Sequence, residues 1–163
     1  DESIRITNSL MDYWNITLDE LHEIGLQNTI RYFSVVSIRL DDLISNMTRW
    51  TMPKQDTKGN IRYVLFNNQE ANGATVLLYP DTLKEFICLH HIKEKYLIIL
   101  PSSIHEVIVL PSNDLSMVDR FQQTVKKVNE RVVAIEEVLS NKVLVYNSIE
   151  DSLSFAKKKS LTL

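Results

Sequence analysis

The stretch that decides the fold is residues 96–132, YLIILPSSIHEVIVLPSNDLSMVDRFQQTVKKVNERV. Two short apolar runs, Tyr96–Leu100 and Val107–Leu110, flank a turn segment that begins at Pro101. Short apolar runs bounded by turn residues predict strands. Because a link of a few residues joins antiparallel neighbours, the stretch predicts a hairpin that leads into a helix.

The helix after this hairpin has the clearest pattern in the chain. Its apolar positions recur at steps of three and four residues: Val118, Phe121, Val125, Val128 and Val132. This spacing places them on one face of a helix, and the opposite face is polar. We therefore expect the face from Val118 to Val132 to belong to the core.

The preceding segment has the same order of elements. Tyr63–Phe66 and Ala74–Tyr79 are apolar runs that predict the strands of another hairpin. Asp81 is expected to cap a helix over residues 83–90. Two successive units of strand, strand and helix indicate an internal duplication.

The N-terminal third has mixed patterns. Ile4–Thr7 predicts a short strand, whereas Thr17 with Glu20 forms a capping box that starts a helix running to Asn28. Residues 33–47 fit no single period. The polar residues 48–60, which include a proline and a glycine, predict a long loop.

The C-terminal end is predicted to close the sheet. Val143–Tyr146 and Leu153–Phe155 would form a last hairpin, followed by a mobile tail over residues 156–163. The inner strands are apolar on both faces, which requires cover on both sides of the sheet. The prediction is one α+β domain over residues 1–163, with a mixed, mainly antiparallel sheet built from strand-strand-helix units and flanking helices. The crossover between Tyr79 and Tyr96 would permit one parallel pair.

Composition excludes several classes of function. The 163 residues are 44% hydrophobic and carry a net charge of −3, which is typical of a globular domain and unlike a nucleic-acid module with a basic face. Three scattered glycines exclude the glycine-rich phosphate-binding motifs. The single cysteine, Cys88, indicates a reducing, cytoplasmic setting, and no apolar run is long enough to predict a membrane span.

The turn segment after Pro101 holds the candidate catalytic residues: Ser102, Ser103, His105 and Glu106. Ser103 and His105 are two residues apart, so in an extended segment they point to one side, where an imidazole activates a hydroxyl. A triad also requires an acid behind the histidine and an oxyanion hole, and the sequence shows neither. The alternative is a hairpin turn capped by local hydrogen bonds, with His105 and Glu106 as cross-strand polar partners.

Metal and cofactor sites are not predicted. His105-Glu106 begins the zinc motif H-E-x-x-H, but position 109 is valine, so the second imidazole is missing. Cys88, His90 and His91 lie close together on a predicted helix, where neighbouring side chains diverge by about 100°. We expect His90 to be a buried or boundary residue beside the predicted core.

Three blocks carry a family resemblance: NGATVLLYPDTLKEF, YLIILPSSIHEVIVLP and VNERVVAIEEVLSNKVLVY. Together with the N-terminal segment IRITNSLMDYWNITLDELHEIGLQNT they resemble a family of uncharacterised proteins from clostridial gut bacteria, known as domain of unknown function family 5688. The resemblance covers roughly residues 4–147 and implies that this chain is the C-terminal part of a longer protein. It implies no activity, cofactor or partner.

Two functions are compatible with these patterns. The first is a non-catalytic protein-interaction or regulatory module that contacts another protein or its own N-terminal region, and neither nucleic acid nor membrane. The second is a small hydrolase-like enzyme centred on the loop 102–106. An exposed apolar patch would favour the module, whereas a pocket with a convergent acid at this loop would favour the enzyme.

Overall fold

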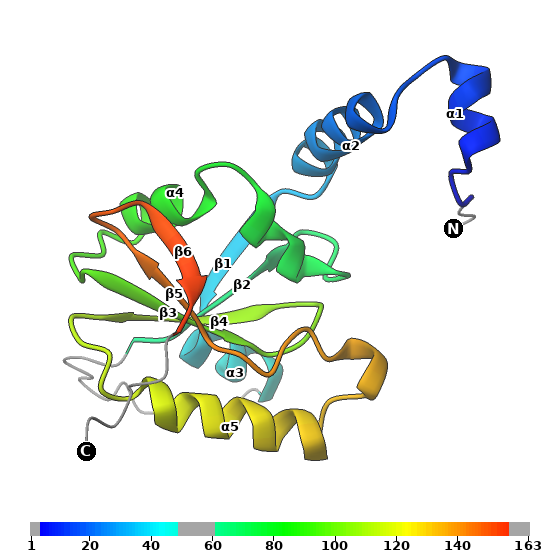
Figure 1. Cartoon of the computed structure of the whole chain (residues 1–163). Helices are drawn as coiled ribbons and strands as arrows, with labels where there is room; N and C mark the ends of the chain where they lie inside the picture. The colour runs from blue at the N-terminus through cyan, green and yellow to red at the C-terminus, as the bar shows by residue number, and fades with distance from the viewer. Residues whose placement is uncertain (1–3, 49–60, 157–163) are drawn as a thin grey trace, which may run out of the picture.

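An antiparallel sheet of six strands organises the part of the chain that the computed structural model describes, residues 4–48 and 61–156 (Figure 1). The strands are β1 (Val35–Arg39), β2 (Tyr63–Asn67), β3 (Tyr96–Pro101), β4 (Val107–Ser112), β5 (Leu144–Asn147) and β6 (Ser152–Phe155). Their order across the sheet is β1-β2-β4-β3-β5-β6. The predicted α+β class is confirmed, and every strand pair in these residues is antiparallel.

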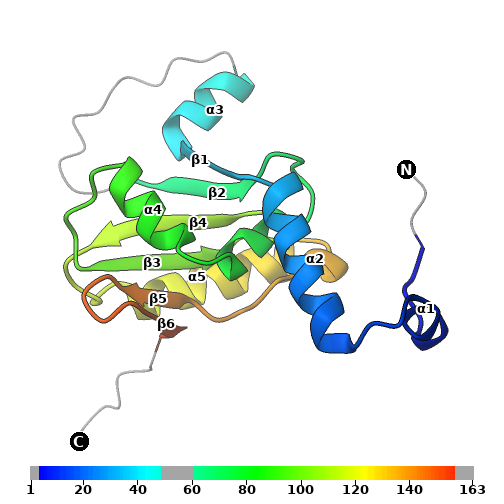
Figure 2. The ribbon, with the colours of Figure 1, turned by 90° about the horizontal axis from the view of Figure 1, so that it is seen from above.

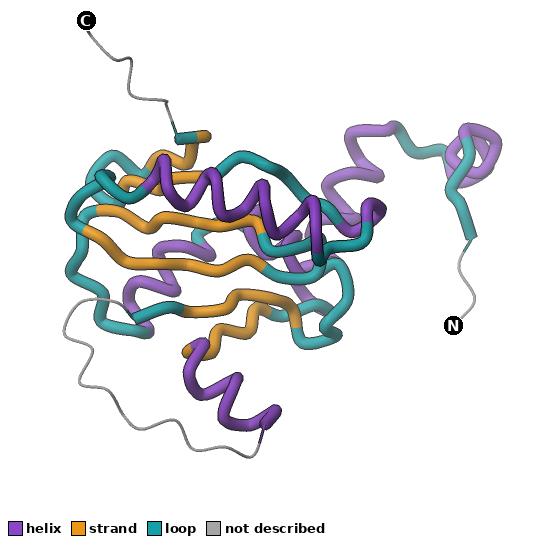
Figure 3. Tube along the Cα trace, turned by 90° about the horizontal axis from the view of Figure 1, so that it is seen from below, coloured by secondary structure: helices purple, strands orange, loops and turns teal. Residues whose placement is uncertain are grey.

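Helices cover both faces of this sheet, as the apolar inner strands require (Figure 2). The α-helices are α1 (Asn8–Trp14), α2 (Leu18–Tyr32), α3 (Leu40–Thr48), α4 (Thr82–Leu89) and α5 (Val118–Arg131). Two short 3-10 helices are η1 (Gly73–Leu78) and η2 (Ile135–Glu137). Helices η1 and α4 lie on one face, and α5 lies along the other (Figure 3).

The side chains of β3 alternate between the two faces of the sheet, which explains why there is one hydrophobic core cluster on each face. Leu97 and Ile99 point to the face that packs against η1 and α4, whereas Ile98 points to the face covered by α5. On the α5 side, Val118 and Val125 are buried against Ile98. The predicted apolar stripe of this helix therefore belongs to the core as far as Val125 only, because Val128 and Val132 are 41% and 78% exposed.

The predicted strand over residues 74–79 is wrong. These residues form the 3-10 helix η1 up to Leu78, because both edges of β2 are already occupied by β1 and β4. The backbone N–H of Ala74 instead donates to the carbonyl of Ile104, 3.1 Å away. The proposed duplication fails with it, since the earlier unit is a strand, a 3-10 helix and a helix.

The N-terminal segment corrects another prediction. Ile4–Thr7 is not a strand among the described residues, and Thr7 instead caps α1 by accepting from the N–H of Leu10. The capping box of Thr17 and Glu20 is confirmed, and α2 continues to Tyr32.

Residues 33–47, which no period assigned, contain β1 and most of α3. The closing hairpin is confirmed as β5–β6, with four residues between its strands. The predicted loop and tail fall largely on residues 49–60 and 157–163, outside the described residues.

Asp81 precedes α4 as expected but does not cap it through its side chain. It adopts a left-handed backbone conformation at φ 57°, and its carboxylate accepts from Lys84 at 2.9 Å. Within the described residues, no helix combines the length and the apolar character needed to cross a membrane.

Candidate functional site

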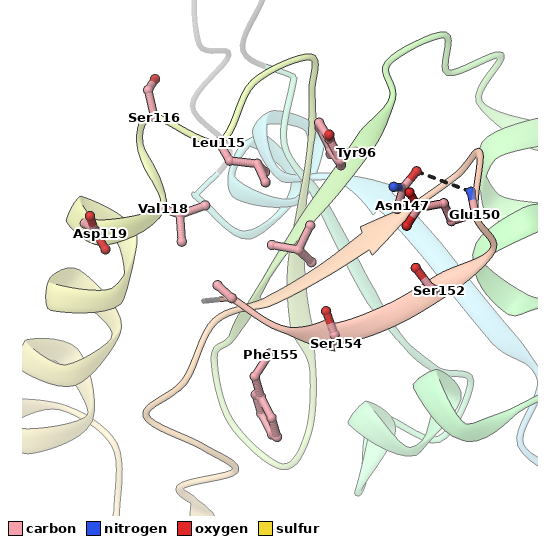
Figure 4. Close-up of a pocket in the computed structure, with 12 residues that line it drawn as sticks. Tyr96, Leu115, Ser116, Val118, Asp119, Asn147, Glu150, Ser152, Ser154 and Phe155 are labelled. Carbon is pink, nitrogen blue, oxygen red and sulfur yellow. Dashed lines mark hydrogen bonds between the residues drawn. The ribbon is translucent and has the colours of Figure 1, made fainter. Parts of the chain in front are cut away.

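A groove lies beside the first turn of α5, because this helix begins short of the sheet edge (Figure 4). Tyr96, Asn147 and Ser152 are directly opposite one another on neighbouring strands, so their side chains share the face on which α5 lies. Val118, at the first turn of α5, packs near Val145, but no helical turn precedes it to cover this row. The start of α5 and the β5–β6 hairpin therefore form the two walls of the groove.

The groove has an apolar floor and a polar rim. Its volume is about 310 Å³, at the lower end of the range for ligand pockets. The residues that line it are Tyr96, Leu115, Ser116, Val118, Asp119, Val145, Asn147, Glu150, Ser152, Ser154, Phe155 and Ala156. Asp119 and Glu150 are the charged members of this set, and both are acidic, while Lys95 and Lys142 lie over the rings of Tyr96 and Phe155.

Strand β6 forms one wall of the groove and is also one of the two edge strands of the sheet. Within the described residues it pairs with β5 alone, and all four of its residues are exposed. Leu153 and Phe155 are 39% and 52% exposed. Sheet edges are usually protected by charged residues, prolines or bulges, and the sequence Ser-Leu-Ser-Phe has no charge or proline. Among residues 4–48 and 61–156, no strand pairs with the outer backbone groups of β6, which are therefore available to another strand.

Side chains hold the β5–β6 turn in place. The side-chain oxygen of Asn147 accepts from the N–H groups of Ile149 and Glu150 at 3.1 and 3.3 Å. On the other face of the hairpin, the buried Tyr146 donates its hydroxyl to Asp151 at 2.7 Å, and Lys84 of α4 contacts the same carboxylate at 2.6 Å. The hydrogen bond from Lys84, and then that from Tyr146, lower the pKa of Asp151.

This cluster predicts a loss of stability in alkali. Burial, followed by the hydrogen bond to Asp151, raises the pKa of Tyr146 from 10.0 to about 12. The folded phenol keeps its proton where the unfolded one loses it, so its contribution is complete below pH 10 and disappears as the pH rises to about 12. Urea unfolding at pH 9 and at pH 11.5 measures this loss. The loss is expected to be smaller in Tyr146→Phe, and an equal loss in both proteins would contradict the assignment.

The candidate catalytic loop, residues 102–106, connects β3 to β4. It lies at the end of β3 that is farther from the groove. Ser103 is buried, and its hydroxyl accepts from the backbone N–H of His105 at 3.0 Å. The N–H of Ser103 donates to the carbonyl of Glu106, and Ser102 is half-buried. These local bonds are those of a capped hairpin turn, which was the alternative interpretation.

The ring of His105 contacts groups other than the serines. Its Nδ1 accepts from the backbone N–H of Asn72 at 3.2 Å, and its Nε2 lies 3.5 Å from a carboxylate oxygen of Glu137. Since Nδ1 accepts, the ring proton resides on Nε2 and faces Glu137. An acid therefore does stand behind this histidine, but Glu137 lies 32 residues further along the chain, so no local pattern in the sequence indicates the contact. Glu106 is not its partner.

This geometry predicts that a serine-directed reagent does not label the loop. Neither ring nitrogen of His105 faces a serine hydroxyl in a position to take its proton, so neither Ser102 nor Ser103 has an activating base. Incubation with a fluorophosphonate probe and peptide mass spectrometry tests the hydrolase alternative. We expect no adduct. An adduct that disappears in His105→Ala would support the enzyme instead.

A serine and an imidazole do form a hydrogen bond at another place in the fold, between β1 and the end of α4. Ser37 of β1 and Nε2 of His90 are 2.7 Å apart, and the His90 ring packs against Tyr63 and Phe86. Burial, and then the neighbouring charge of His91, lower the pKa of His90. The expectation of a boundary histidine is confirmed, and the pair ties the edge strand β1 to the end of α4.

Within the described residues, no group of three or more His, Cys, Asp or Glu side chains is arranged to hold an ion. Cys88 is exposed on α4, while His90 is turned toward Ser37. No metal-binding site is therefore formed by the sequence neighbours Cys88, His90 and His91.

Fold and groove together define a helix-covered antiparallel α+β domain in which β1 and β6 are the edge strands of the sheet. The chain belongs to a family of unknown function, DUF5688, whose model matches residues 1–148. The match ends in the β5–β6 turn, so β6 lies beyond it. A search of curated proteins and a search of solved structures found no match.

Proposed function

We propose that this chain is a non-catalytic protein-binding module that takes up an extended peptide segment along β6. The observation that carries the proposal is the open edge of β6 next to an apolar groove with an acidic rim. An extended segment that pairs with a sheet edge gains main-chain hydrogen bonds, and pockets for its alternate side chains give specificity.

The groove indicates the chemistry of the segment. Side chains of an added strand alternate between the two faces of the sheet, so every second one would point toward the α5 face. There the floor near Leu115, Val118 and Val145 suits an aliphatic side chain. Glu150 and Asp119 at the rim suit a lysine or arginine. The proposed ligand is therefore a β-forming segment with aliphatic and basic residues.

The partner is proposed to be another protein and not nucleic acid, because two carboxylates at the rim repel phosphate groups. The cytoplasmic setting expected from the single cysteine belongs to the same proposal. So do the clostridial source and the C-terminal position in a longer protein, which the sequence resemblance implies.

Fluorescence polarisation with a synthetic peptide tests the module. The probe is Thr-Val-Lys-Val-Thr-Lys-Val with an N-terminal fluorophore, and its charge-reversed form carries Glu in place of Lys. We expect the basic peptide to bind and the acidic one not to. Glu150→Lys should weaken binding about ten-fold, the equivalent of about 1.4 kcal/mol.

The matched control is Glu136→Lys, which makes the same charge change at an exposed site of η2 away from the groove. Equal weakening by both variants would show attraction to net charge only and would contradict a groove site. Absence of binding by the basic peptide at millimolar concentration would also overturn the proposal.

One further binding experiment tests whether the C-terminal residues of the chain itself occupy the groove. Residues 157–163, Lys-Lys-Lys-Ser-Leu-Thr-Leu, have the composition proposed for the ligand. A chain ending at Ala156 is compared with the full chain in the same titration. Equal affinity supports an external partner, whereas binding that appears only in the shortened chain would assign the groove to these residues and overturn the partner.

A further inference from the structure

The start of β6 is attached to α4, on the face of the sheet opposite to the groove. Lys84, in the first turn of α4, contacts the carboxylate of Asp151 at 2.6 Å, and Asp151 is the last residue before β6. Figure 1 shows the β5–β6 turn beside α4. The same ammonium nitrogen contacts Asp81 at 2.9 Å. One lysine therefore joins the beginning of a helix to the beginning of the edge strand.

This contact differs from an ordinary surface ion pair. Lys84 and Asp151 are both exposed, and isolated pairs of that kind contribute little to stability. Here the buried Tyr146 donates to the same carboxylate at 2.7 Å, so the three side chains form a network. A lysine in the first turn of a helix opposes the helix dipole. The stability of α4 alone therefore does not explain the position of Lys84.

The backbone of Asp151 determines how the chain enters β6. Its φ is 50°, a left-handed conformation that residues other than glycine adopt uncommonly. Turn geometry fixes the register of a hairpin, and a slip of one residue moves every side chain to the other face. In the observed register Ser152 and Ser154 face the groove, and Leu153 and Phe155 alternate with them along the strand. This wall of the groove therefore depends on the conformation of Asp151.

We propose that Lys84 is a positioning residue for the β6 edge, because it holds Asp151 in the conformation that keeps Ser152 and Ser154 on the groove face. Lys84 is not among the described residues that line the groove, so it acts on a bound segment only through β6. Its effect on peptide binding rests on the proposed function. Its effect on the order of β6 does not.

Amide hydrogen exchange measures the order of the strand directly. In Lys84→Met we expect the β6 amides that bond to β5 to exchange about five-fold faster than in the original chain, with those of β3 unchanged. Lys84→Arg keeps the positive charge and should restore the original rate. Lys126→Met is the matched control, because it removes a lysine that pairs with Glu130 on α5, and it should change neither strand.

Three results of the exchange experiment would overturn the proposal. The first is an unchanged rate for β6 in Lys84→Met. The second is an equal acceleration of β3, which would report a general loss of stability and not a local one. The third is an equal acceleration of β6 in Lys126→Met.

The basic peptide Thr-Val-Lys-Val-Thr-Lys-Val tests the consequence for binding. We expect Lys84→Met to bind it about five-fold more weakly than the original chain and Lys84→Arg to restore the affinity. Loss of a positive charge from the protein would by itself favour a basic peptide, so weaker binding reports the position of β6. Faster exchange of β6 with unchanged affinity would contradict the positioning role.

Two further backgrounds identify the carboxylate that transmits the effect. The loss of affinity caused by Lys84→Met is expected to become smaller in Asp151→Asn and to persist in Asp81→Asn. The reverse result would mean that Lys84 stabilises only α4, and it would overturn the proposal. If the original chain does not bind the peptide at all, the proposed function fails, whereas the exchange rates still decide the role of Lys84.

Discussion

Gly73→Ala is expected to lower the free energy of unfolding by about 3 kcal/mol or more, because the added methyl group has no space. Its Cβ would collide with the carbonyl oxygen of His105 and would lie 2.9 Å from both the backbone nitrogen of Asn67 and the Cβ of Phe66. Two of these three atoms are backbone atoms. Removing this steric clash therefore requires η1 to move away from the 101–106 loop, and that movement breaks the Ala74–Ile104 hydrogen bond.

The matched control is Gly25→Ala, in the interior of α2. No atom lies within 4 Å of the added Cβ, and alanine stabilises a helix interior relative to glycine by about 0.5–1 kcal/mol. Urea unfolding at a protein concentration of 1 µM compares the two variants with the original chain. Equal stability of Gly73→Ala and Gly25→Ala would contradict the close packing of η1 against the loop.

Leu97→Ala is the second substitution with a large expected effect. Leu97, the second residue of β3, is 0% exposed and belongs to the core cluster that joins β2, β4, η1 and α4. Removing its side chain loses apolar burial and leaves a cavity that the central strands cannot easily fill. Comparable substitutions cost about 2–5 kcal/mol, and urea unfolding measures the loss directly.

Leu78→Ala makes the same chemical change at an exposed site. Leu78 is 74% exposed in η1, so the expected change is within about 0.5 kcal/mol. A loss in Leu78→Ala as large as that in Leu97→Ala would mean that helical or strand propensity, and not burial against the sheet, determines the effect.

Local patterns predicted the centre of the fold correctly. The β3–β4 hairpin and α5 follow one another in the chain, and their apolar spacing and turn residues act over short distances. The misread segment, residues 74–79, has an apolar composition that suits a strand. It becomes η1 because β4, far along the chain, already pairs with β2. That competition between segments is not visible in a local pattern.

The groove was equally hidden from the sequence. It depends on where α5 begins relative to the β5–β6 hairpin, and its lining comes from separate segments that individually read as core or turn. The candidate loop illustrates the same limit. Its residues were identified, but the contacts of His105 come from Asn72 and Glu137, which only the folded chain brings to it.

The order of strands suggests how the sheet assembles. The centre is β4-β3, a hairpin with a short connection, and each side adds first an inner strand, β2 or β5, and then an outer one, β1 or β6. Short connections close with little entropic cost, so the central hairpin is the natural first element and the outer strands join last. When the sheet opens locally, the strands that join last are the first to separate. Amide hydrogens of β6 therefore exchange with solvent before those of β3, and the edge that is offered for binding is also the part of the sheet that most readily adjusts to what binds it.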